Sequence, residues 1–120
     1  PLTAASALKM SYAGITKGFT ALGAGMMLAA TRGGSAEALK AELAESRPDL
    51  LRYLSNQVPS MYSKAYRWVA ELDEIASFVG ADHAEHEMLS AAARFYERIA
   101  EDVDDDKKEI GALDKFLGKS

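Results

Sequence analysis

The sequence opens with a long proline-free segment, residues 3–31, that is rich in Ala, Leu and Met. This composition predicts one long helix, ended by Gly33 and Gly34. Its second half carries no charge between Lys17 and Arg32, so it is apolar on every side and we expect it to lie in an interior. The uncharged stretch is shorter than the roughly 20 residues that span a bilayer, so we expect a buried helix and no membrane segment.

Four later signals predict where further helices begin. Ser35 is placed to cap a short helix, and Pro48 suits the first turn of another. Pro59 is expected to start a second long helix, whose apolar residues recur every three or four positions until Gly80. Asp82 and the residue three positions later have the spacing of a capping box. The apolar positions expected to face the core after that box are Ala84, Met88, Ala91, Phe95 and Ile99.

The acidic run over residues 101–106 is predicted to be a loop, and Asp106 with Glu109 is predicted to open a last helix. Val and Ile are scarce and no long run alternates apolar and polar residues, which disfavours strands. We therefore expect an all-α fold. A single helical domain over residues 1–120 would form a bundle of about six helices wrapped around the long, largely buried first helix.

Composition excludes several classes of function. The 120 residues include no cysteine, which rules out disulfides, thiolate metal sites and cysteine nucleophiles and permits a cytoplasmic location. The formal charge of -4 lacks the basic excess that favours nucleic-acid binding. The first residues show no basic and apolar targeting segment. We accordingly expect no nucleic-acid and no membrane partner.

Three apparent motifs have simpler explanations. Gly23 and Gly25 imitate a dinucleotide-binding loop, but they lie inside a helical segment and are better explained by close helix packing. His83 and His86 lie among acids but lack the Glu-x-x-His pairs of di-iron bundles, so no metal is expected. The alternating aspartates of the acidic run resemble half of an EF-hand loop, but Lys107 occupies the glycine position.

Lys9 is the charged residue that fits its surroundings least. It lies among small and apolar residues, and no acid on the same predicted helix is available to pair with it. A lysine that loses hydration has a lowered pKa and becomes a usable general base. Tyr12 and Thr16 follow at helical spacing, so the three side chains share one face and form a candidate wall of a polar pocket. The alternative is that Lys9 extends to water, as lysines in early helical turns commonly do.

Two segments carry a family resemblance. Residues 7–18 (ALKMSYAGITKG) and 67–76 (RWVAELDEIA) resemble the C-terminal helical domain of the β-hydroxyacid dehydrogenases, the relatives of 6-phosphogluconate dehydrogenase, and in particular a poorly characterised branch of them. The resemblance extends over nearly the whole chain. In that family a lysine on the long first helix of this domain removes the hydroxyl proton of a small hydroxy acid as hydride leaves. Lys9 matches that lysine.

The family motif is only partly kept. Its two glycines correspond to Thr3 and Ala5, and its asparagine corresponds to Ala13. Tyr12 and Thr16 are therefore our candidates for hydrogen-bonding the substrate. Lys17 is a further candidate for an anionic substrate group, with an ordinary surface lysine as the more usual alternative. A lysine and aspartate found later in the family correspond to Glu71 and Leu72, to which we assign no role.

The resemblance also implies what surrounds this domain. NAD or NADP would be bound mainly by an N-terminal Rossmann domain of the same polypeptide that is missing from this chain, so the chain alone is expected to be inactive. The family commonly pairs through its helical domains, so a homodimer is expected. Two alternatives remain open: a stand-alone helical dimerisation or interaction module without catalysis, and a parent enzyme that reduces imines or similar groups, which the retained Lys9 disfavours.

Overall fold

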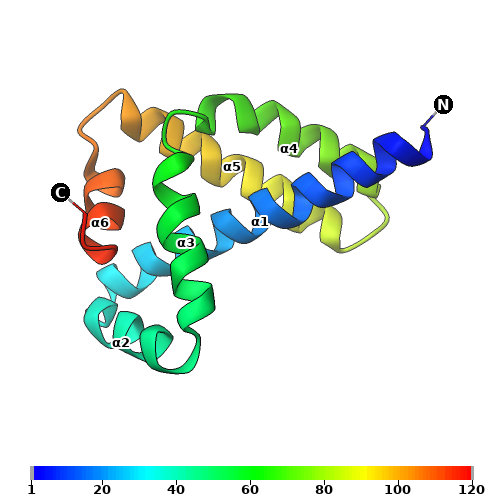
Figure 1. Ribbon diagram of the computed structural model, residues 1–120. Helices are drawn as coiled ribbons and strands as arrows, with labels where there is room; N and C mark the ends of the chain where they lie inside the picture. Colours follow the sequence, from blue (N-terminus) through cyan, green and yellow to red (C-terminus); the bar gives the residue numbers. More distant parts are fainter. Residues whose placement is uncertain (1, 120) are drawn as a thin grey trace.

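The computed structural model describes residues 2–119, and within them the secondary structure is entirely helical (Figure 1). This confirms the predicted all-α bundle and its number of helices. The elements in chain order are α1 (Ala4–Arg32), α2 (Ala36–Ser46), α3 (Pro48–Ser60), α4 (Ala65–Val79), α5 (Glu85–Val103) and α6 (Lys108–Phe116). None of these helices is both long enough and apolar enough to cross a membrane.

Helix α1 begins and ends at recognisable signals. The Thr3 hydroxyl accepts a hydrogen bond from the Ser6 amide at 3.0 Å, which satisfies one of the free donors of the first turn. At the other end the chain leaves the helix through Gly33 and then Gly34, whose φ of 77° is a left-handed conformation that glycine adopts without strain. The predicted extent of this helix is therefore confirmed to within about one residue at each end.

The expectation that the second half of α1 lies wholly in an interior is wrong. One face is buried by the other helices, but Leu22 and Met26 on the opposite face are 61% and 55% exposed. The reason is geometric, because five short helices cover a 29-residue rod on only part of its circumference. The buried residues of α1 are Thr20, Ala21, Ala24, Met27 and Leu28.

Pro59 does not start a helix, contrary to the prediction. It lies in the last turn of α3, and a turn over residues 61–64 separates α3 from α4. Val58 and Met61 on either side of it are both fully buried, so the apolar face of α3 continues past the proline. The missing amide and the bulk of the ring favour an end to the helix nearby, and α3 ends one residue later.

Helices α4 and α5 form an antiparallel hairpin and pair along most of their length (Figure 1). The predicted capping box is not formed, because α5 begins at Glu85 and no side chain caps it. Asp82 instead lies beside His83, with 3.7 Å between carboxylate and ring nitrogen. The predicted core register of α5 was also partly wrong, since Met88 is 68% exposed. The helix buries a neighbouring face that consists of Ala92, Ala93, Tyr96, Ile99 and Asp102.

The acidic run is not a loop throughout, because α5 continues into it as far as Val103. Asp102 is 7% exposed, and its two carboxylate oxygens accept hydrogen bonds from the amides of Glu109 and Ile110 at 3.0 and 2.9 Å. These amides belong to the first turn of α6, where no intrahelical acceptor exists. The last helix is therefore anchored by the end of α5, while the Asp106 carboxylate accepts a hydrogen bond from the Lys108 amide.

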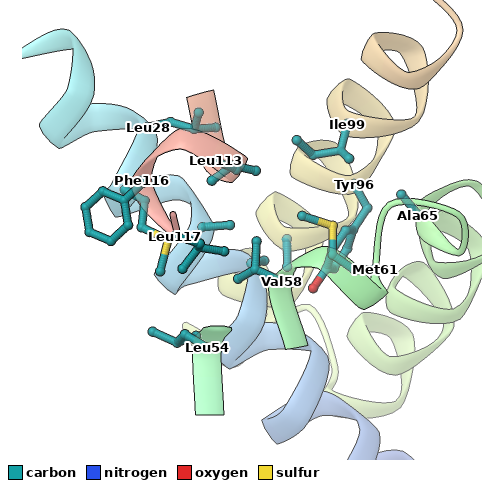
Figure 2. Close-up of a cluster of buried hydrophobic side chains, with 14 of the residues drawn as sticks. Leu28, Leu54, Val58, Met61, Ala65, Tyr96, Ile99, Leu113, Phe116 and Leu117 are labelled. Atoms are coloured by element: carbon teal, nitrogen blue, oxygen red, sulfur yellow. The ribbon is translucent and has the colours of Figure 1, made fainter. Parts of the chain in front are cut away.

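The hydrophobic core lies where α1, α3, α4, α5 and α6 meet (Figure 2). Helix α3 crosses α1 closely at Gly23, where an added Cβ would lie 2.7 Å from Leu54 Cδ2. This confirms that the glycine serves close helix packing. The buried side chains of this core that Figure 2 labels are Leu28, Leu54, Val58, Met61, Ala65, Tyr96, Ile99, Leu113, Phe116 and Leu117.

Candidate functional site

Lys9 lies on the first turns of α1, at the end of the molecule opposite α6 (Figure 1). Its side chain is exposed, and among the described residues it has no hydrogen-bond or ion-pair partner. Small neighbours on the same helix do not bury it, because a single helix at the edge of a bundle cannot surround one of its own side chains. Any dehydration of this ammonium group has to come from a surface outside the described residues.

Tyr12 and Thr16 lie on the same side of α1 as Lys9, as the spacing predicts. Tyr12 is 69% exposed. The Thr16 hydroxyl donates to the main-chain carbonyl of Tyr12 at 3.2 Å, so its proton is already used within the helix and its oxygen remains free to accept. The three side chains therefore make an open polar face on α1.

Lys17 lies away from this face and packs against α4. Its ammonium group is 2.8 Å from the Glu71 carboxylate and 5.0 Å from the centre of the Trp68 ring. The side chain is only 19% exposed, so Lys17 is not an ordinary surface lysine. The Lys17 ammonium group already contacts the Glu71 carboxylate and the Trp68 ring. An anionic substrate group would have to compete with these contacts.

A groove of about 370 Å³ lies beside Thr16, between α1 and α3. Helix α3 contributes Asp49 and Tyr53 to it, two polar residues that sequence reasoning missed because they are more than thirty positions away from Thr16. The carboxylate of Asp49 accepts two hydrogen bonds from the Arg47 guanidinium, at 3.2 and 3.1 Å, and this contact lowers the pKa of Asp49. The only sequence signal for this groove is the helix start at Pro48, which puts Asp49 in a first turn.

A second groove, of about 510 Å³, runs between α1 and α5. Gly14, Gly18, Gly25, Met26 and Met88 are among the residues that line it. No titratable side chain lines it, so this groove has no acid or base for catalysis. Its chemistry is that of an apolar contact surface.

The histidines near the start of α5 have separate environments. His86 Nδ1 lies 2.7 Å from the carbonyl oxygen of Ala76, which links the first turn of α5 to the last turn of α4. His83 is largely exposed beside Asp82. Among residues 2–119 no group of three or more His, Asp or Glu side chains is arranged to hold a metal ion.

Comparison with known proteins gives a family. A domain of unknown function, DUF1932, matches residues 30–99, more than half of the chain. The chain belongs to the DUF1932 family. No curated protein and no solved structure matches it. The DUF1932 match runs from the last turns of α1 into α5, so it includes Trp68 and Glu71 but begins after Lys9, Tyr12 and Thr16.

Proposed function

We propose that this DUF1932 chain is the C-terminal helical domain of a longer NAD(P)-dependent oxidoreductase that acts on a small hydroxy acid, with Lys9 as the general base. The observation that carries the proposal is the position of Lys9. Within residues 2–119 this lysine has no ion-pair partner, and it lies on the exposed start of the longest helix, beside the exposed side chains of Leu8 and Tyr12. The resemblance of residues 7–18 to the hydroxyacid dehydrogenases supports the same role.

A second domain placed over this face would give Lys9 the properties of a base. Covering Leu8 and Tyr12 removes water from the lysine, and dehydration favours the neutral amine. A neutral amine accepts the proton of a substrate hydroxyl, and in this proposal the Tyr12 hydroxyl donates a hydrogen bond to the same substrate. Crevices between domains are common places for small-molecule sites.

The described residues do not form a nucleotide site by themselves. They contain no strand, and so no strand-turn-helix phosphate loop of the dinucleotide-binding kind. NAD or NADP would therefore be held mainly by a Rossmann domain encoded upstream, and we assign no residue of this chain to the cofactor. The reading frame upstream of Pro1 tests this point: it should encode a strand, a G-x-G-x-x-G turn and a helix, and their absence would rule out the proposal.

The proposed enzyme is a cytoplasmic homodimer that pairs through this domain. The lack of cysteine fits a reducing compartment. The exposed apolar side chains along α1 favour pairing, because large contiguous apolar surfaces on soluble proteins mark interaction sites. The same observation favours a second candidate function, a helical dimerisation or interaction module without catalysis. In that case Lys9 would have no effect on any reaction.

Substitution of Lys9 in the full-length enzyme separates the two functions. Reduction of NAD or NADP is followed by absorbance with a panel of small hydroxy acids, and Lys9→Ala should lower kcat by about 100-fold or more. Lys9→Arg should lower it similarly, because guanidinium does not lose its proton near neutral pH. Lys64→Ala, at an exposed lysine before α4, is the matched control and should leave kcat unchanged. An unchanged rate in Lys9→Ala would exclude Lys9 as the base.

A further inference from the structure

A third groove lies at the end of the molecule opposite Lys9, where α2 and α6 contact each other and the last turns of α1 (Figure 1). Its volume of about 500 Å³ falls in the range of small-molecule sites. Helix α2 contributes Glu37 and Lys40 to it, and α6 contributes Lys115 and Phe116. Charged side chains from two helices therefore border one concave surface.

Lys40 is a partly buried lysine on the wall of this groove. Within residues 2–119 its ammonium group has no ion-pair or hydrogen-bond partner, although an added Cβ at Gly118 would lie only 3.3 Å from its Nζ atom. Lys17, which is also partly buried, pairs with Glu71 at 2.8 Å. Partial burial removes water from an ammonium group, so Lys40 favours a negative group in the groove.

The helix ends around the groove do not require Lys40 as a cap. A lysine near a helix C-terminus often bonds the last free carbonyl oxygens. In α6, however, the amides of Gly118 and Lys119 donate to the carbonyls of Lys115 and Asp114, at 3.2 and 2.7 Å. The end of α1 is closed by backbone amides in the same way. The ammonium group therefore remains available to a ligand.

Lys115 adds a second positive charge from the opposite helix. It is exposed, and among the described residues its ammonium group has no ion-pair partner. Glu37 is the acid among the lining residues, and it forms an ion pair with neither lysine. The lining thus has two lysines and one glutamate, an excess of one positive charge in a chain of formal charge -4. A concave surface concentrates the potential of such charges.

We propose that this groove binds an organic phosphate, a phosphate monoester with a small apolar body. Lysine binds phosphate as a point charge, whereas arginine is the residue that holds carboxylates through paired hydrogen bonds. Lys40 and Lys115 contact the phosphate in this arrangement. Ala112 and Phe116 supply apolar surface for the rest of the ligand.

This site is separate from the proposed reaction site. Thr31, which lines the groove, is about 33 Å from Lys9 along α1 at a rise of 1.5 Å per residue. One small ligand cannot reach both residues. The inference therefore assigns a second ligand, and it depends neither on catalysis by Lys9 nor on the identity of the substrate.

Titration of the ¹⁵N-labelled 120-residue chain with phenyl phosphate, followed by NMR, tests the ligand class. The amides of Gly34, Ala36 and Ala112 should shift, with a Kd below about 1 mM. Inorganic phosphate lacks the apolar body and benzyl alcohol lacks the charge, so each should bind at least about 5-fold more weakly. Equal binding of inorganic phosphate would overturn the organic ligand, and equal binding of benzyl alcohol would overturn the role of the charge.

Substitutions test the two lysines. Lys40→Ala and Lys115→Ala should each raise the Kd of phenyl phosphate by at least about 5-fold, because each removes a charge-assisted contact. Alanine is the better helix former, so circular dichroism should show the fold retained. Lys108→Ala, at an exposed lysine in the first turn of α6, is the matched control and should leave the Kd unchanged. Glu37→Gln should lower the Kd by about 2-fold, because it removes a repelling charge.

Two results would overturn the site itself. One is a Kd that Lys40→Ala and Lys115→Ala leave unchanged, or that Lys108→Ala raises equally, since the probe would then respond to positive charge in general. The other is the absence of any shift at a probe concentration of about 10 mM. Neither result bears on turnover by the full-length enzyme, which tests the proposed function independently.

Discussion

The hydroxyl of Tyr96 donates a hydrogen bond to the main-chain carbonyl of Lys17 at 2.5 Å, linking the middle of α5 to the middle of α1. The ring is fully buried and packs edge-on against Trp68 at a centroid distance of 5.1 Å. Within an α-helix each main-chain carbonyl already accepts a hydrogen bond from the amide four residues later. The Tyr96 hydroxyl is therefore a second donor to the Lys17 carbonyl, and it comes from a different helix. It fixes the height at which α5 crosses α1.

Removing this hydroxyl should destabilise the fold modestly. Tyr96→Phe keeps the ring and its packing, and the carbonyl of Lys17 keeps its intrahelical partner. We expect the free energy of unfolding to fall by about 1–1.5 kcal/mol, as measured by urea denaturation. Tyr53→Phe is the matched control, because Tyr53 is 36% exposed and its hydroxyl has no partner among the described residues. An equal loss in both variants would contradict the assigned contact.

Asp102 should matter more than any other acid of the acidic run. Asp102→Ala removes both acceptors from the first turn of α6, and a lost cap of this kind costs about 1–2 kcal/mol. The effect should be local, so hydrogen exchange of α6 amides should accelerate more than that of α4 amides. Asp105→Ala, at an exposed neighbouring position, should leave exchange unchanged. Similar exchange in both variants would show that Asp102 does not anchor α6.

Adding a methyl group at Gly23 and at Gly111 should change the free energy of unfolding in opposite directions. Gly23→Ala would place a Cβ 2.7 Å from a side-chain carbon of buried Leu54, and we expect a loss of about 1–3 kcal/mol from overpacking. Gly111 in α6 has no heavy atom within 4 Å of the corresponding point, so Gly111→Ala should stabilise the fold by about 0.5–1 kcal/mol. Thermal unfolding of both variants decides, and a stabilised Gly23→Ala would refute the close crossing.

Alkaline pH should destabilise the fold through two tyrosines. Burial raises the pKa of Tyr96, and burial together with the hydrogen bond to Asp114 raises the pKa of Tyr62. A group with a raised pKa in the folded state contributes stability that is complete below its unfolded pKa, about 10 for tyrosine, and is lost as the pH rises above it. We therefore expect the free energy of unfolding to decline above about pH 10.

The Tyr62→Phe and Tyr96→Phe double variant provides the control for that decline. Its unfolding free energy should change less between neutral and alkaline pH than that of the unmodified chain, because neither position titrates. Urea denaturation across the pH range measures the difference. Parallel curves for the two proteins would assign the alkaline loss to other groups.

Sequence signals located those parts of the fold that depend on neighbours along the chain. The end of α1 at Gly33 and the start of α3 at Pro48 follow from local backbone preferences and were predicted. Pro59 and Asp102 were misplaced because distant contacts decide them. The residues flanking Pro59 are buried, and this burial favours continuation of α3 past the proline. Asp102 lies in the last turn of α5, where its charge alone would be unfavourable, because its carboxylate accepts hydrogen bonds from free amides of α6.

In the candidate site too, features set by neighbours along the chain were predicted, and features set by distant contacts were not. The shared face of Lys9, Tyr12 and Thr16 follows from helical periodicity and was predicted. Lys17 pairs with Glu71, which is far from it in the sequence. The periodicity of α1 alone could not predict this pair. The exposed side of α1 was missed for a related reason, since an all-apolar helix does not reveal which of its sides the remaining helices leave uncovered.

The contacts around Lys17 have a consequence for a residue that they never touch. Helix α1 is held at this turn from two directions, by Tyr96 on its backbone and by Glu71 on its side chain, so its rotation about its own axis is set there. Lys9 lies two turns away on the same helix. The direction in which its side chain leaves α1 is therefore set by the contacts of α1 with α4 and α5. Glu71 and Tyr96 belong to the DUF1932 segment. This segment thereby orients Lys9, which lies outside it.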